Sequence, residues 1–235
     1  MDKTKLKIKD KDIVVPGEIL AEGMSYLPSQ GTYRQGNNIL ASRLGLAKID
    51  GKVIKIIPLS GKYLPKKGDV IIGKVTDINF SGWAVETNSA YRAMLSMKDG
   101  SSDFIRRGSD LTKYFEIGDH ILTKIYNVTS QNLIDLTMKG PGLRKLKDGR
   151  LMKVASTKVP RIIGKQGSMV SMIKKATNCN IIVGQNGIVW IKGNNPEDEV
   201  LTVETIEMIE AQSHISGLTE KIKKFLESKG KKVGE

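Results

Sequence analysis

The sequence predicts a multidomain protein that is mainly β over residues 1–140 and α+β over residues 141–235. Short apolar segments cut by glycine and proline run through the first part, a pattern typical of small β domains. After Gly140, Pro141 and Gly142, apolar residues instead recur at the helical period. A chain of 235 residues is also long enough to form three small cores.

Residues 1–65 predict a small N-terminal β domain. Apolar segments at residues 13–15, 39–41 and 52–58 have the length of strands and are separated by turn residues. Proline, two lysines and a glycine at residues 65–68 interrupt this pattern and predict a domain boundary.

Residues 66–140 predict a five-stranded barrel. The strand candidates are residues 70–78, 82–87, 91–95, 120–128 and 133–138. Ile134, Leu136 and Met138 alternate with polar residues, as they do in a strand with one buried face. A long polar stretch, residues 98–118, separates the third strand from the fourth. This arrangement fits an OB barrel, although a generic small β-barrel fits the pattern nearly as well.

Residues 141–235 predict a domain with the order β-α-α-β-β-α, followed by a short helix. The expected elements are a strand at 151–155, helical segments at 159–163 and from 168, strands at 180–183 and 188–192, and helices at 196–213 and 219–228. We expect Ser168 to cap the second helix. Asn186 and Gly187 are a hairpin-turn pair, and Asn195 before Pro196 indicates a helix start.

The charge of the chain indicates a polyanionic partner. The formal net charge is +13 and the isoelectric point is about 9.7. Residues 141–235 carry 17 basic and 10 acidic side chains, whereas residues 66–140 are nearly balanced at 10 and 9. One segment, residues 139–165, holds nine basic residues against the single acid Asp148. A solvated basic linker is the alternative reading of that segment.

Several classes of site are disfavoured by composition. Cys179 is the single cysteine, so no intrachain disulfide can form, and we expect a buried thiol. His120 and His214 lie near no cysteine pair, so we expect no metal site and place both at the surface or at caps. Neither a signal peptide nor a bilayer-length apolar run is present, which predicts a cytoplasmic protein without membrane contact.

A glycine loop at residues 164–167 is the strongest functional signal. Its two glycines allow a sharp turn and the close approach of another chain. The following helix directs free N–H groups and its positive dipole end toward that approach. A tight turn without function is the alternative, but residues 162–170 also match the KH signature of an aliphatic pair, GxxG, two residues and an aliphatic. KH domains clamp about four nucleotides with this loop. The predicted RNA-binding residues are Arg161, Ile163, Gly164, Lys165, Gln166, Gly167 and Ser168.

The barrel segment resembles the S-one type of RNA-binding OB fold. Gly73, Val75, Ile78, Gly82, Val85 and Leu95 stand at that family's spacing. Where many members carry stacking aromatics and a histidine, this chain has Ser81, Ala84 and Ser96, and its aromatics are displaced by one residue. The predicted RNA contacts are Lys74, Phe80, Trp83, Tyr91 and Arg92. Trp83 lies two residues before Val85 and therefore on the same face of the strand. Packing in the core is thus an equal alternative for Trp83.

The order of these parts, over about residues 10–228, is similar to the RNA-binding cap subunit of the archaeal exosome. The resemblance implies a non-catalytic protein without cofactor. It implies three copies on a hexameric ring of phosphorolytic ribonuclease subunits, alone or mixed with a zinc-ribbon cap protein. The barrels would guide single-stranded RNA, with A-rich tails favoured, into the pore for degradation or processing. The predicted ring-docking residues are Val14, Val15, Pro16, Gly17 and Glu18.

Two other functions remain open at this point. A free-standing RNA-binding transcription or translation factor could combine the same modules, although such transcription factors usually carry two KH domains. An exoribonuclease would need a catalytic domain of about this whole length, and no segment is free to supply one.

Overall fold

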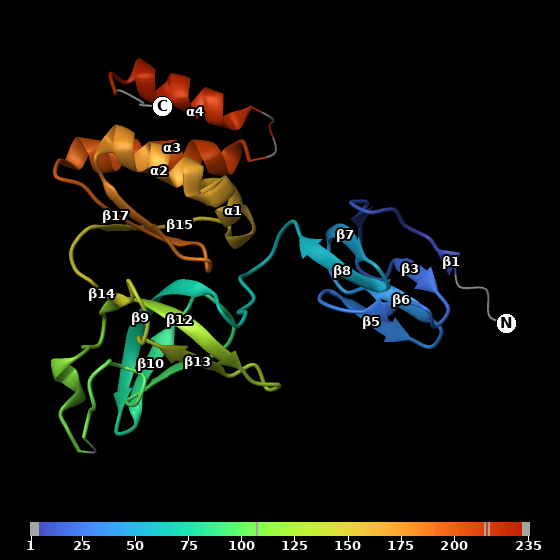
Figure 1. Cartoon of the computed structure of the whole chain (residues 1–235), viewed down its shortest axis with the longest axis horizontal. Helices are drawn as coiled ribbons and strands as arrows, with labels where there is room; N and C mark the ends of the chain where they lie inside the picture. Colours follow the sequence, from blue (N-terminus) through green and yellow to red (C-terminus); the bar gives the residue numbers. More distant parts are fainter. Residues whose placement is uncertain (1–4, 107, 214, 216, 232–235) are drawn as a thin grey trace. The chain divides into compact units, whose positions relative to one another are not determined.

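A computed structural model describes residues 5–106, 108–213, 215 and 217–231 (Figure 1). The chain divides into two compact units, residues 1–61 and residues 62–235. The first is a β domain, and the second combines a barrel with an α+β domain. The predicted multidomain fold class is confirmed. His214 lies outside the described residues.

The first unit consists of two four-stranded sheets around one core. One has the order β1-β3-β6-β5 and the other β2-β7-β8-β4. Their strands are β1 (Lys5–Leu6), β2 (Ile13–Val14), β3 (Ile19–Glu22), β4 (Leu27–Pro28), β5 (Thr32–Gln35), β6 (Asn38–Ala41), β7 (Gly45–Asp50) and β8 (Val53–Pro58). Val14, Leu20, Ile39 and Ile54 are completely buried between them. Sequence reasoning predicted β2, β6 and β8 and missed the other five strands. In β5 the residues are polar or aromatic and show no apolar alternation.

The barrel closes through five strands. They are β9 (Val70–Asn79), β10 (Gly82–Glu86), β11 (Ala93–Ser96), β12 (His120–Val128) and β13 (Ile134–Thr137). β9 pairs antiparallel with β10 and with β12, and β10 pairs antiparallel with β11. The ring is completed by β13, which pairs parallel with β11 and antiparallel with β12. Closure removes the sheet edges. A further strand, β14 (Arg144–Leu146), pairs with β12, and the long excursion carries a 3₁₀ helix, η1 (Leu111–Lys113).

The α+β domain has the predicted order of elements. Its sheet, in the order β15-β17-β16, consists of β15 (Arg150–Lys153), β16 (Asn180–Val183) and β17 (Ile188–Lys192). The helices are α1 (Val159–Ile163), α2 (Ser168–Thr177), α3 (Pro196–Ala211) and α4 (Leu218–Ser228), with 3₁₀ turns at η2 (Ser156–Lys158) and η3 (Lys165–Gly167). Figure 1 shows α2 and α3 along one side of the sheet and α4 packed beyond α3. Cys179 is buried in this core, as expected.

The barrel and the α+β domain belong to one compact unit because they share a small apolar cluster. Ile72 and Leu122 from the barrel, Leu146 from β14 and Trp190 from β17 are all buried in it. The predicted turn at Asn186 also contacts the barrel: its side chain is fully buried and hydrogen-bonded to barrel backbone. The glycine loop is therefore carried on the same compact unit as the barrel.

Candidate nucleic-acid interface

The glycine loop is shaped by a residue that must be glycine. Gly164 ends α1 with φ 76° and ψ 175°, a conformation that residues with a Cβ rarely adopt. A Cβ on Gly164 would lie 2.7 Å from the backbone nitrogen of Met169 in α2. The loop backbone therefore runs directly against the first turn of α2.

The two residues inside the loop are presented to solvent. Lys165 and Gln166 are both exposed, and Gln166 has a left-handed backbone with φ 53°. Ser168 is the first residue of α2, and Gly167 takes the N-cap position. The expected cap by Ser168 is therefore wrong: within the described residues, α2 has no side-chain cap hydrogen bond. The N–H of Ser168 donates instead to the carbonyl of Lys165, and that of Gly167 donates to the carbonyl of Gly164 at 3.2 Å.

The two residues before the loop have different surroundings. Ile163 is half-buried and packs against the core of the α+β domain, so only part of its side chain is accessible to RNA. Arg161 is exposed, and its Nε donates to the carbonyl of Ser213 at 2.9 Å. That bond holds the guanidinium near the end of α3.

A further cation lies beside the basic segment and was not predicted. Burial, together with the charge of Arg144, lowers the pKa of Lys174 below its usual value. Lys174 is half-buried on α2, and Arg144 is exposed on β14. No sequence signal marked Lys174, because it lies outside the basic segment and within an ordinary amphipathic helix pattern. Lys145 is instead paired with Asp119, at 2.5 Å.

Trp83 is not an RNA-stacking residue. Its ring is completely buried in the barrel core, and its Nε1 donates to the carbonyl of Phe115 at 3.1 Å. The rings of Trp83 and Phe115 meet edge to face, with centroids 5.2 Å apart. The predicted contact is wrong and the core alternative holds, because Trp83 and Val85 both point inward from β10.

The other predicted barrel residues do not form one cluster. Phe80, at the β9–β10 turn, is 96% exposed and lines one cavity. Tyr91, half-buried, and Arg92, exposed, line a second cavity beside β10 and β11. Lys74 lies in a third hollow together with His120. The barrel therefore offers several separate surfaces rather than a single platform.

The N-terminal segment 14–18 is a turn in which one predicted docking residue is hidden. Val14 is fully buried, so its predicted contact with another protein is wrong, whereas Val15 is 53% exposed. Gly17 has φ 85°, as the third residue of a type II turn after Pro16 requires. The carboxylate of Glu18 accepts the backbone N–H of Val15 at 2.9 Å, which holds the turn closed.

An apolar strip, which sequence reasoning missed, crosses the sheet beside that turn. Ile13 of β2 pairs with Leu46 of β7, and Leu46 pairs with Ile57 of β8. Ile13 and Ile57 are 66% and 48% exposed. Apolar side chains in adjacent register on one sheet form a continuous surface, which marks a contact site when it is exposed. We refer to Ile13, Leu46 and Ile57 as the apolar strip.

Across residues 5–106, 108–213, 215 and 217–231, no three or more His, Cys, Asp or Glu side chains group as metal ligands would. In the same part of the chain, no helix combines the length and apolarity needed to cross a membrane.

Comparison with known proteins identifies all three segments. Three family profiles match: "Exosome RNA binding protein RRP4 N-terminal domain" over residues 11–60, "RRP4, S1 domain" over residues 62–107 and "KH domain" over residues 149–197. S1 is the S-one type of RNA-binding OB fold.

Curated archaeal proteins match along nearly the whole chain. The exosome complex component Rrp4 of Methanothermobacter thermautotrophicus is 43% identical over 222 residues, which is 94% of this chain and 70% of that protein. The protein of the same name from Pyrococcus furiosus is 44% identical over 233 residues, or 97% of this chain and 87% of that one.

A solved structure agrees. A crystal structure of a candidate exosome complex RNA-binding protein superimposes with a TM-score of 0.66 and 32% identity, covering 72% of this chain and 98% of that one. Identity of this degree along nearly the whole chain, with the three profiles in the same order, shows that the chain belongs to the Rrp4 family of exosome components.

Proposed function

We propose that this chain is a non-catalytic RNA-binding cap subunit of the exosome. In this proposal it binds single-stranded RNA, A-rich tails among it, and guides 3′ ends into a phosphorolytic ring for degradation or processing. Residues 1–65 dock on the ring, residues 66–140 contact RNA near the pore and residues 141–235 supply the KH loop. The names of the curated relatives support exosome membership. A free-standing transcription or translation factor is not favoured by these relatives.

The exposed glycine loop is the observation that carries RNA binding. Exposed Lys165 supplies a cation, and the start of α2 beside it supplies the positive end of the helix dipole, which favours a phosphate. Gly164 lets the loop pack against the first turn of α2, so Lys165 and Gln166 are held at the start of that helix. Arg161 and the basic segment extend the positive surface away from the loop. Contacts of this kind position the RNA backbone, so they predict binding with strong salt dependence.

A charge-matched pair of double variants tests the loop. Lys165→Asp with Gln166→Asp places two carboxylates at the start of α2. The control, Thr219→Asp with Lys221→Asp, changes the net charge equally at exposed positions of α4. In a filter-binding titration with single-stranded RNA, we expect the loop variant to bind at least about tenfold more weakly than the control. Equal affinities of the two variants would remove the loop from the proposal.

Docking on the ring is proposed for the apolar strip together with Val15, Pro16, Gly17 and Glu18. Ile13, Ile57 and Val15 expose apolar surface that a protein partner would cover. We propose that three copies of this chain occupy one face of a hexameric ring, alone or mixed with a zinc-ribbon cap protein. Co-purification of ring subunits in equal amounts with the tagged chain is the expected result.

The absence of catalysis is also testable. We expect the purified chain to leave a labelled single-stranded RNA intact with or without inorganic phosphate. Shortening of the RNA that depends on phosphate, by the chain alone, would overturn the non-catalytic assignment.

A further inference from the structure

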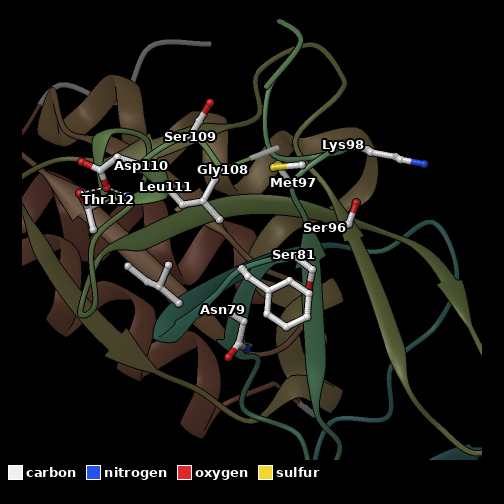
Figure 2. Close-up of a pocket in the computed structure, with 12 residues that line it drawn as sticks. Asn79, Ser81, Ser96, Met97, Lys98, Gly108, Ser109, Asp110, Leu111 and Thr112 are labelled. Carbon is white, nitrogen blue, oxygen red and sulfur yellow. Dashed lines mark hydrogen bonds between the residues drawn. The ribbon is translucent and has the colours of Figure 1, made fainter. Parts of the chain in front are cut away.

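The barrel borders hollows of different kinds. The cavity in Figure 2, lined by residues 78–81, 96–98 and 108–112, includes Phe80 and belongs to the proposed RNA surface. Another hollow, of about 280 Å³, lies between the barrel and the KH domain, with lining residues on β9, β10, β12, β15 and β17. We refer to it as the interdomain cleft. Ligand sites occur preferentially at domain boundaries, and this volume is near the lower end of the usual range of about 300–1,000 Å³.

The barrel side of the cleft presents three polar side chains in a row. Glu86 on β10 and His120 on β12 both stand opposite Lys74 on β9, the strand between them. Residues directly opposite on adjacent antiparallel strands have Cβ atoms about 4.5–5.5 Å apart. A cation therefore stands between a carboxylate and an imidazole. Within the described residues, Lys74 and Glu86 form no ion pair and no side-chain hydrogen bond.

The KH side of the cleft supplies a second cation and an apolar wall. Leu151 and Lys153 lie two residues apart on β15, so their side chains share one face of the strand. Lys153 stands opposite Ile188 of β17, and Ile188 packs against the apolar cluster that joins the two domains. That face is therefore turned toward the barrel. Lys153 is exposed and, in the part of the chain that the structure describes, has no ion-pair partner.

Asn88 connects the two sides of the cleft. Its Nδ2 donates to the carbonyl of Asn186 in the KH hairpin at 2.9 Å, and its Oδ1 accepts no hydrogen bond from the described residues. An amide oxygen of this kind can accept an N–H of a nucleobase. The cleft thus combines two unpaired lysines, one unpaired carboxylate, a free amide oxygen and an apolar wall.

We propose that the interdomain cleft binds one free nucleoside phosphate. Lys74 and Lys153, one from each domain, pair with the phosphate. Glu86 accepts the ribose hydroxyls, as acidic side chains do in dinucleotide-binding folds. The base lies on the apolar wall and donates to Asn88. A carboxylate beside a lysine disfavours a bare anion but suits a ribose phosphate, which carries both kinds of group.

The ligand is a free nucleotide because the cleft has the volume of one small molecule rather than of several linked nucleotides. The inference therefore does not depend on the proposed RNA binding. It also gives the contact between the barrel and the KH domain a second role, since both domains supply a cation to the same phosphate.

Isothermal titration calorimetry of the full chain with AMP, GMP, CMP and UMP tests the cleft. We expect at least one of the four to bind. Lys153→Gln should bind that nucleotide about tenfold more weakly, because a charge-assisted contact is lost. Lys147→Gln is the control, since Lys147 is exposed in the same basic segment and does not line the cleft. Binding of none of the four, or equal affinities of the two variants, would overturn the proposal.

Ligand analogues separate the parts of the nucleotide. Inorganic phosphate and the free nucleoside should each bind the wild type at least about tenfold more weakly than the nucleotide does. Equal binding of either analogue would reject a nucleoside phosphate as the ligand. The 2′,3′-dideoxy nucleotide should also bind more weakly, and Glu86→Ala should remove this difference. A difference of the same size in Glu86→Ala would contradict the ribose contact.

Competition with RNA distinguishes this inference from the proposed function. Saturating oligoadenylate should leave the affinity for the nucleotide unchanged, and Lys153→Gln should bind oligoadenylate as tightly as Lys147→Gln does. Displacement of the nucleotide by oligoadenylate would show that the cleft holds RNA, and a free ligand would then be excluded. A chain that binds the nucleotide but no RNA would support this inference and remove the proposed function.

Discussion

The side-chain amide of Asn186 pairs with both backbone polar groups of Ile72, as a residue of a neighbouring strand would. Its Nδ2 donates to the carbonyl of Ile72 at 2.7 Å, and its Oδ1 accepts the N–H of Ile72 at 3.3 Å. The same Nδ2 donates to the carbonyl of Thr87 at 2.9 Å. Ile72 and Thr87 belong to the barrel segment and Asn186 to the hairpin between β16 and β17. One buried amide therefore links the KH domain to the barrel.

Replacing this amide should weaken the unit that contains both domains. Asn186→Ala leaves the backbone groups of Ile72 and Thr87 buried without partners, and each such group costs about 1–3 kcal/mol. We expect the free energy of unfolding to fall by about 2–4 kcal/mol in a urea titration. Asn180→Ala, an exposed asparagine on the same sheet, should change it by less than about 0.5 kcal/mol. Equal effects of the two variants would contradict a special role for the amide.

Substitution of Trp83 should lower the stability of the chain, whereas substitution of Phe80 should not. Trp83→Phe removes a buried hydrogen bond to Phe115 and leaves a small void, so the free energy of unfolding should fall by about 1–3 kcal/mol. RNA affinity of the folded variant should not change. Phe80→Ala should leave the urea midpoint unchanged, because the ring is exposed. A loss of RNA affinity in folded Trp83→Phe would restore the stacking role that its burial excludes.

The apolar strip should be needed for docking and not for folding. Ile57→Asp places a charge on the strip at a position that is 48% exposed. We expect the variant to fold and to lose ring subunits in co-purification, because an unpaired carboxylate would be buried at the contact. Tyr33→Asp is the control, since Tyr33 is 42% exposed on the other sheet of the same unit. Retention of the ring by Ile57→Asp would place the contact elsewhere.

His120 should make the chain less stable in mild acid. Burial, reinforced by the charge of Lys74, lowers its pKa below the usual 6.5, although Asp119 and Glu86 act in the opposite direction. The unfolded chain therefore binds the proton more tightly than the folded chain does. The contribution of neutral His120 to the free energy of unfolding is complete above pH 6.5. It is lost as the pH drops from 6.5 toward the lowered pKa of His120 in the folded chain.

The variant His120→Asn isolates this contribution. Urea midpoints of the wild type and the variant are compared about one unit above and about one unit below the usual histidine pKa. We expect the wild type to lose more stability than the variant on acidification. A constant difference between the two proteins across that interval would show that His120 does not contribute to the pH dependence.

Much of the element order and the KH loop could be predicted because their signals are local. The strands β12, β16 and β17 have the predicted bounds, since turn residues delimit short apolar runs. The glycine loop could be predicted because its two glycines, their spacing and the following helix are all contained in residues 164–177. The cavity lined by residues 78–81, 96–98 and 108–112 could not be predicted in this way, because its lining comes from three separate segments of the chain.

The sequence by itself determined the class of each domain, their order along the chain and the loop that presents Lys165. Periodicity and turn chemistry depend on neighbouring residues, so they can be read without knowing the fold. The tertiary structure alone decided that Val14 and Trp83 face inward, that Ile13 and Ile57 form a strip and that Asn186 is buried against Ile72. Alternation gives a strand two faces, but which face is covered depends on what packs against it, and those partners are distant in sequence.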